Sequence, residues 1–347
     1  MQKLGLNELW LDIFSDGIAF IPNSRLYSKT IPIGTDILAE AITKAQGTGI
    51  AVYANMQLLH WGGATPDSAR NLTILGETNA ETAIHAHERN PNPQYDDITM
   101  REIPFKIPPL VVSPAASWVR DDLGEVVRLA SMHTDLAGFI WQGAKDDDDL
   151  GYTPETRLSF LRSAHADPLD LTPTNYSLAD ISLPSFDDDD VDKKLAEQWK
   201  KTRQGALLDL LKQMRWSMTP PISELPVLMG LGEGQLEWAA SWDDTKTLPP
   251  TLRSAFDDNY YHSAQEIADV ARTRSKEMLL RENVLNDGDT DFLARTLKAD
   301  LGTGKWDGYV LDFKREEVTQ GKFPLDSLVR AVNLPLQKHA GITDTKQ

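Results

Sequence analysis

The sequence contains no cysteine, which excludes disulfide bonds and thiolate metal sites and is compatible with a secreted or periplasmic protein. No glycine-rich dinucleotide or phosphate-loop fingerprint follows any apolar run, which favours a barrel over an open doubly wound sheet. No stretch approaches the ~20 apolar residues of a membrane helix. The opening segment MQKLGLNELW lacks the basic region and apolar core of a signal peptide. We therefore expect neither membrane insertion nor a cofactor.

Positive charge is scarce. The 35 Lys and Arg residues face 52 Asp and Glu residues, giving a formal net charge of -17. A chain this acidic repels the phosphates of nucleic acids and anionic lipids, so a neutral or cationic ligand is expected. With 347 residues, 41% of them hydrophobic, the chain can bury a large core. This length suits one α/β barrel domain spanning residues 1–347.

A unit of amphipathic helix, turn and short apolar strand recurs along the chain. Residues 119–134 lead into LAGFIWQG, and ILAEAITKAQGTG leads into IAVYANMQ. Helices that alternate with buried strands predict βαβ units and a parallel sheet. We therefore predict a (β/α)8 barrel, complete or lacking one βα unit. Its expected strands are 9–15, 50–56, 109–113, 138–142, 226–231 and 308–313, with weaker signals at 71–76 and 102–107.

Two runs of four aspartates have different expected roles. Asp187–Asp190 precede a long amphipathic helix, where carboxylates cap free N–H groups and complement the helix dipole. Asp146–Asp149 fall between an expected strand and a helix that begins near Thr153 and Pro154. Four adjacent like charges favour full hydration, so this second run is expected to form a solvated rim.

The order of these segments resembles a known family. The strand segments LWLDIFSDGIAFIPNSRL and TGIAVYANMQLLHWG precede GYTPETRLSFLRSAHADPLDL, and the long helix KKLAEQWKKTRQGALLDLLKQMRW follows. The pattern is similar to bacterial family-10-like glycosyl-hydrolase-like barrels over about residues 5–216. The resemblance implies an extracytoplasmic (β/α)8 protein that acts on carbohydrate. It also implies that the first strand and helix of the barrel are missing, so that the start looks truncated.

One position departs from that family. The resemblance places catalytic acids at the end of the strand that here reads GFIWQG, where Trp141 and Gln142 stand instead. Gln142 can hydrogen-bond a sugar hydroxyl but cannot transfer a proton near neutral pH. Two functions therefore remain open: a glycoside hydrolase using acid/base chemistry, and an inactive carbohydrate-binding or cell-envelope scaffold barrel.

Working residues of such barrels lie at the carboxyl ends of the strands. Amides and carboxylates there can bind sugar hydroxyls, and indoles can stack on sugar rings. Each tryptophan could equally be a packing residue, and the aspartate of the Asp-Gly pair could be a turn residue. The expected substrate-binding residues are Asp16, Asn55, Gln57, Trp61, Trp141, Gln142 and Trp238.

Glycoside hydrolysis needs two carboxyl groups, one of them a proton donor. Glu233 follows an expected strand between two glycines and lies near Trp238, so it is the first candidate donor. Asp312 or Asp149 is the candidate partner. Alternatively, Glu233 is a solvated loop acid and Asp312 forms a structural ion pair with Lys314 or Arg315.

Metal motifs are incomplete. The stretch NDGDTD at 286–291 lacks the glycine and glutamate that a calcium loop needs at its sixth and twelfth positions. His85 and His87 do not have the i, i+4 spacing of a zinc helix. No metal is therefore expected.

Overall fold

The protein is described from a computed structural model. For strands β4, β5 and β8–β11, and for residues 190–192, the description is limited to the backbone. The residues described are 6–27, 34–61, 67–89, 91, 94–95, 102–103, 105, 107–108, 110–144, 150–171, 190–218, 227–230, 253–257, 277–283 and 308–312.

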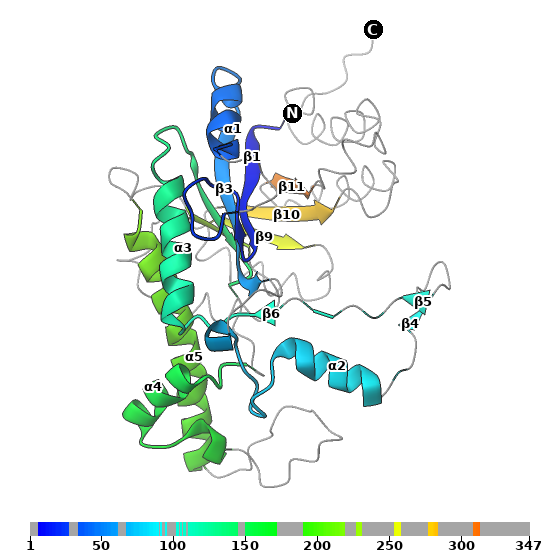
Figure 1. The fold of residues 1–347 in the computed structure, drawn as a ribbon, viewed down its shortest axis with the longest axis vertical. Helices are drawn as coiled ribbons and strands as arrows, with labels where there is room; N and C mark the ends of the chain where they lie inside the picture. The colour runs from blue at the N-terminus through cyan, green and yellow to red at the C-terminus, as the bar shows by residue number, and fades with distance from the viewer. Residues whose placement is uncertain are drawn as a thin grey trace.

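One large sheet organises the molecule (Figure 1). Its parallel strands lie side by side in chain order, each paired with the next. From β1 to β8 this order follows from βαβ crossovers, since each one returns the chain to the same edge of the sheet. The strands are β1 (Glu8–Asp16), β3 (Ala51–Trp61), β7 (Gly138–Gln142), β8 (Val227–Gly230), β9 (Arg253–Asp257), β10 (Glu277–Asn283) and β11 (Gly308–Asp312).

The first strand turns back sharply at its end. Asp16 and Gly17 both have positive φ, at 53° and 75°, and connect Ser15 of β1 to Ile18 of the antiparallel β2 (Ile18–Ala19). Two positive-φ residues between paired strands are typical of a type I′ hairpin, which favours Asp-Gly. Asp16 is therefore a turn residue.

Helices fill the crossovers from β1 to β3, from β3 to β7 and from β7 to β8. One side of the sheet packs against α3 and α5, which Figure 1 shows beside each other. Asp36 starts α1 by accepting a hydrogen bond from the Ala39 amide at 2.9 Å. As expected, α4 begins at Pro154 after Thr153. The bounds are α1 (Ile37–Ala45), α3 (Ser117–Ala130), α4 (Pro154–Ala164) and α5 (Asp190–Trp216), with short 3₁₀ turns at Asp67–Ala69 and Pro168–Leu171.

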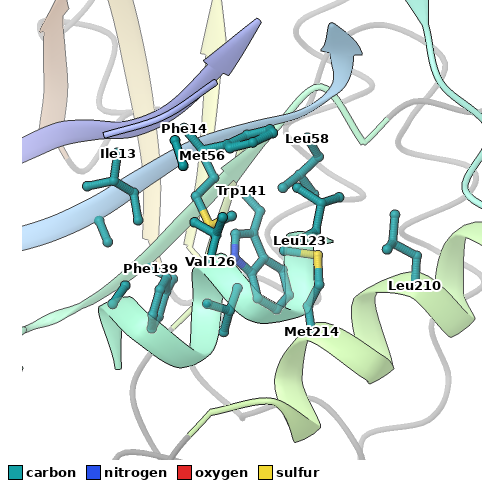
Figure 2. Close-up of a cluster of buried hydrophobic side chains, with 14 of the residues drawn as sticks. Ile13, Phe14, Met56, Leu58, Leu123, Val126, Phe139, Trp141, Leu210 and Met214 are labelled. Atoms are coloured by element: carbon teal, nitrogen blue, oxygen red, sulfur yellow. The ribbon is translucent and has the colours of Figure 1, made fainter. Parts of the chain in front are cut away.

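Alternation along the strands builds the core between the sheet and these helices. Phe139 and Trp141 of β7 and Met56 of β3 point to the helix side (Figure 2). They pack with Leu123 of α3 and Met214 of α5, and all five side chains are fully buried. Successive strand residues face opposite sides, so the residues between them must lie on the other face of the sheet.

A long excursion separates β3 from α3. It contains α2 (Asn79–Arg89), the small hairpin of β4 (Gln94–Tyr95) and β5 (Glu102–Ile103), and β6 (Leu110–Val111). Thr78 and Glu81 form a reciprocal capping box at the start of α2, with the Thr78 amide 2.8 Å from Glu81 Oε2. The excursion begins where β3 ends, at the carboxyl edge of the sheet.

Several strand predictions need correction. Segment 109–113 forms only β6, which pairs antiparallel with the end of β3. Segment 71–76 forms a turn rather than a strand, and the described residues of 102–107 contribute only β5. Strands β9 and β10 were not predicted, because RSAFD is charged at both ends and EMLLREN contains good helix formers. Pairing with neighbouring strands overrides that local preference.

Candidate functional site

The face of the sheet opposite α3 and α5 has an apolar floor. Tyr53 of β3 and Ile140 of β7 are buried there together, and Trp10 of β1 packs against them. These residues belong to neighbouring strands and alternate with the core residues of the helix side. They form a base for the polar residues that follow on the same strands.

Two positions further along each strand, the same face becomes polar. Gln142 Nε2 donates to Asn55 Oδ1 at 2.7 Å, and Asn55 Nδ2 donates to Asp12 Oδ1. Asp12 lies directly opposite Asn55 in the register of β1 and β3. The three side chains form a hydrogen-bonded line across three strands, which we call the polar row (Asp12, Asn55 and Gln142).

A second polar pair extends this surface toward the end of β3. Gln57 lies beside Gln142 in the strand register, and its Nε2 is 3.0 Å from Nδ1 of His60. The chain leaving β7 passes close to this pair at Gly143, where φ is 68°. A Cβ on Gly143 would lie 2.5 Å from Gln57 Nε2 and 2.9 Å from His60 Nδ1, so only glycine fits without displacing them.

The loop after β7 is held firmly where it joins the fold. Ala144 and Leu150 are buried on either side of residues 145–149. Arg203 of α5 donates to the Leu150 carbonyl at 3.2 Å, and Asn71 Oδ1 accepts from the Gly151 amide at 2.9 Å. Leu150 and Gly151 are therefore bonded to α5 and to the excursion.

The structure overturns the binding role predicted for Trp61 and Trp141. Trp61 is 2% exposed, donates from Nε1 to the Leu58 carbonyl at 2.6 Å, and packs against Phe14 and Trp118. Trp141 is fully buried among the helices (Figure 2). Strand alternation points Trp141 into the core, and Trp61, which follows an irregularity in the pairing of β1 and β3, packs in the same core cluster. Neither indole can therefore stack on a ligand.

The remaining expected site residues divide by location. Asn55, Gln57 and Gln142 come together on the floor described above. Asp16 lies at the hairpin turn, over Trp61 in the register of β1 and β3. Asp312 ends β11, the last strand in the order of the sheet. Glu233, Trp238 and Asp149 lie outside the described residues.

Asp12 is a member of the site that the sequence analysis missed. It lies in the middle of β1, whereas the sequence predicted functional residues at the ends of strands. The signal was present in ELWLDIFS: one charged residue interrupts an apolar strand, two positions after Trp10. Parity along β1 places Asp12 on the same face as Trp10.

The carboxyl groups with shifted pKa values that the described residues include lie away from the polar row. Hydrogen bonds from Thr78 lower the pKa of Glu81 at the start of α2. Burial raises the pKa of Asp122 on α3, which is 1% exposed and pairs with Arg25 at 2.7 Å. A hydrogen bond from Arg157 lowers the pKa of Asp167. All three have structural partners.

The described ranges hold no group of three or more His, Asp or Glu residues placed to bind a metal ion. Nor does any helix within them have the length and hydrophobicity needed to cross a bilayer.

Solved structures share this fold. An α-L-fucosidase (isoenzyme 2) from Paenibacillus thiaminolyticus aligns with a TM-score of 0.58 and 12% identity, over 99% of this chain and 46% of that one. A β-galactosidase from Bacillus circulans sp. alkalophilus aligns with a TM-score of 0.50 and 11% identity, over 99% of this chain and 53% of that one. The chain thus spans about half the length of each protein.

The class of fold is therefore glycosidase-like. At these identities the likeness concerns the fold alone, and it does not single out the family-10-like group. No protein-family model and no curated protein sequence matches the chain.

Proposed function

We propose that this chain is a glycoside-hydrolase-like barrel that binds a carbohydrate on the inner face of its parallel sheet. The observation that carries the proposal is the polar row above an apolar floor, continued by Gln57 and His60. Amides and a carboxylate beside apolar side chains match the alternation of hydroxyl and C–H surfaces on a sugar. The glycosidase-like fold supports the same ligand class.

The order of the strands supports a barrel over an open sheet. In an open doubly wound sheet the order reverses at a switch point, where ligands bind. Here the parallel strands run from β1 to β11 without a reversal. We propose that the sheet curls so that β11 approaches β1, and that the site lies at the carboxyl ends of the strands.

For catalysis we propose two carboxyl groups, one as proton donor and one as its partner. Glu233 would donate the proton, shielded by Trp238, and Asp312 or Asp149 would act as nucleophile or base. A separation of about 5–5.5 Å between the two carboxyl groups would indicate retention of anomeric configuration, and a wider one inversion. Extracytoplasmic localisation is proposed on the family resemblance.

Hydrolysis assays test the enzyme proposal. The chain is incubated with nitrophenyl α-L-fucoside, nitrophenyl β-D-galactoside and a panel of neutral polysaccharides, and released product is measured. Glu233→Gln keeps the shape of the side chain and removes the titrating proton, so turnover should fall about 100-fold or more while binding is retained. Turnover within a few-fold of wild type would remove Glu233 from the mechanism.

A binding scaffold is the second candidate, and Gln142 favours it. The amide stands where the resembling family places an acid, and it is 8% exposed and committed to Asn55. Calorimetry on the same glycans distinguishes the two functions. Binding without turnover across the panel would select the scaffold.

A further inference from the structure

We propose that Asp12 is the carboxylate of this site that contacts the ligand, and that Asn55 and Gln142 position it. The inference rests on the proposed carbohydrate-binding function and assigns its contact residue. Neither strand ends nor the resemblance pointed to Asp12. Three observations on the polar row support this role: the direction of its hydrogen bonds, the increase in side-chain exposure from Gln142 to Asp12, and the register of β1 with β3.

The hydrogen bonds of the row run in one direction. An ionised carboxylate only accepts, so Asn55 must present its Nδ2 group to Asp12. The carbonyl oxygen of Asn55 then faces Gln142, which must present Nε2. Because each amide is committed by its neighbour, the carboxylate determines the orientation of both amides, and they in turn hold Oδ1 of Asp12.

Burial decides which end of the row faces a ligand. Gln142 is 8% exposed, Asn55 is half-buried and Asp12 is exposed. The row is therefore anchored in the protein at Gln142 and reaches solvent at Asp12. A buried anchor restricts the rotamers of the exposed group, and such preorganisation lowers the entropy cost of binding.

The backbone of β1 supports this placement. Regular pairing with β3 continues up to Asp12 opposite Asn55 and is then interrupted by a shift in register before Phe14. Ile13 and Phe14 are both buried. Asp12 is therefore the last residue of the regular stretch of β1 to face the floor, and β-bulges of this kind commonly adjust side chains beside functional sites.

The chemistry of the row indicates its ligand. Asp12 offers carboxylate oxygens, which accept hydrogen bonds from hydroxyl groups, and Trp10 and Tyr53 lie one level below on the same face. Hydrogen bonds from hydroxyls to a carboxylate are stronger than those between neutral groups. A neutral sugar that places a hydroxyl over Asp12 is the ligand class that fits.

Two measurements on the full chain test the assignment. The first is the side-chain amide NMR signal pair of Asn55, assigned by comparison with Asn55→Ser. We expect it to move in Asp12→Asn, which loses the charge, and in Gln142→Met, which loses the donor. The second is calorimetric affinity for neutral cello-, xylo-, manno- and agaro-oligosaccharides, L-fucose and galactose.

Affinity should fall about tenfold or more in Asp12→Asn, the scale of a lost hydrogen bond to a charged group. Gln142→Met should weaken affinity less, because it acts through Asn55. The matched control is Glu40→Gln, the same chemical change at an exposed position of α1, and it should alter neither readout. Thermal unfolding of every variant checks that the fold is retained.

The outcomes separate this assignment from the proposed function. If the wild type binds a glycan and Asp12→Asn binds it equally well, the role of Asp12 is wrong and the carbohydrate site stands. An Asn55 signal unchanged in both variants would also overturn the positioning role. If the wild type binds none of the glycans, the proposed function falls, and the ligand role of Asp12 falls with it.

Discussion

Trp141 shows that the face of the sheet to which a side chain points decides its role. Its ring is fully buried against α3 and α5, and within the described structure its Nε1 has no hydrogen-bond partner. An indole buried with an unpaired N–H still contributes, because the contacts of the large ring outweigh the cost of about 1–3 kcal/mol for that group.

Replacing this ring should therefore affect folding before binding. Trp141→Ala should lower the free energy of unfolding by about 3–5 kcal/mol, through lost contacts and the cavity left behind. Trp216→Ala is the control, since that ring is 72% exposed, and it should change stability by less than about 0.5 kcal/mol. Urea titration measures both. A stable Trp141→Ala variant that loses glycan binding would restore the stacking role.

Gly143 allows a similar comparison beside the site. Gly143→Ala and Gly76→Ala both place a Cβ at positive φ, at 68° and 77°, and each should cost about 1–2 kcal/mol. Gly76 has nothing within 4 Å of the added Cβ, whereas Gly143 has Gln57 and His60. Only Gly143→Ala should therefore shift the NMR signals of the His60 ring. An equal effect of both variants on that ring would show that Gly143 does not support the pair.

At the scale of elements, α4 is tied to the 3₁₀ turn that follows it. Arg157 donates to both carboxylate oxygens of Asp167, through Nε at 3.1 Å and Nη2 at 2.5 Å. Asp167 also accepts from the Leu169 amide at 3.0 Å. The side chains are about one-third exposed, so solvent weakens the pair.

The Arg157–Asp167 pair makes the free energy of unfolding depend on pH. The lowered pKa of Asp167 means that its contribution is present above the ordinary aspartate value of 3.8 and is lost as the pH falls through the folded value. Asp167→Asn should cost about 1 kcal/mol at pH 7 and progressively less in more acidic solution. Urea titrations across this pH range measure the difference. Asp170→Asn, on the same turn, serves as the control; a pH-independent loss in Asp167→Asn would contradict the ion-pair explanation.

At the scale of the molecule, the distance between the two edges of the parallel sheet tests whether it curls into a barrel. The chain has no cysteine, so introduced cysteines are the only labelling sites. Asn7 and Asp307 immediately precede β1 and β11. Six strand spacings separate these edges by about 29 Å if the sheet is flat, against about 10 Å if the sheet curls into an eight-stranded barrel with one strand position between β1 and β11.

Spin labels at Asn7→Cys and Asp307→Cys should therefore report the short separation. The pair Asn7→Cys and Asp135→Cys is the reference, because β1 and β7 are separated only by β3. Comparable distances for the two pairs would support the barrel. A much longer distance for the first pair would show that the sheet is open, and the carboxyl ends of β1 and β11 could not then line one site.

The sequence by itself determined the layered α/β plan. The periodicity of α1, α3 and α5 and the apolar strands β1, β3, β7, β8 and β11 could be read locally, because a covered parallel sheet needs apolar residues on both faces. The sequence also allowed Asp16 to be a turn residue instead of a binding residue, because two successive positive-φ positions favour Asp-Gly. Asn55, Gln57 and Gln142 were predicted by their places near strand ends.

The tertiary structure alone decided which side chains meet. Alternation along β7 points Trp141 into the core and Gln142 to the opposite face of the sheet. A shift of one residue in the strand register would exchange the two, so the pairing of β7 decides which residue faces the site. Asp12 joins the site through its register with Asn55, 43 residues away in the chain. Strand β9 forms despite its charged ends and β10 forms against its local helix preference, because pairing with neighbouring strands stabilises both. Register and pairing arise between distant segments, so no single segment of the sequence carries them.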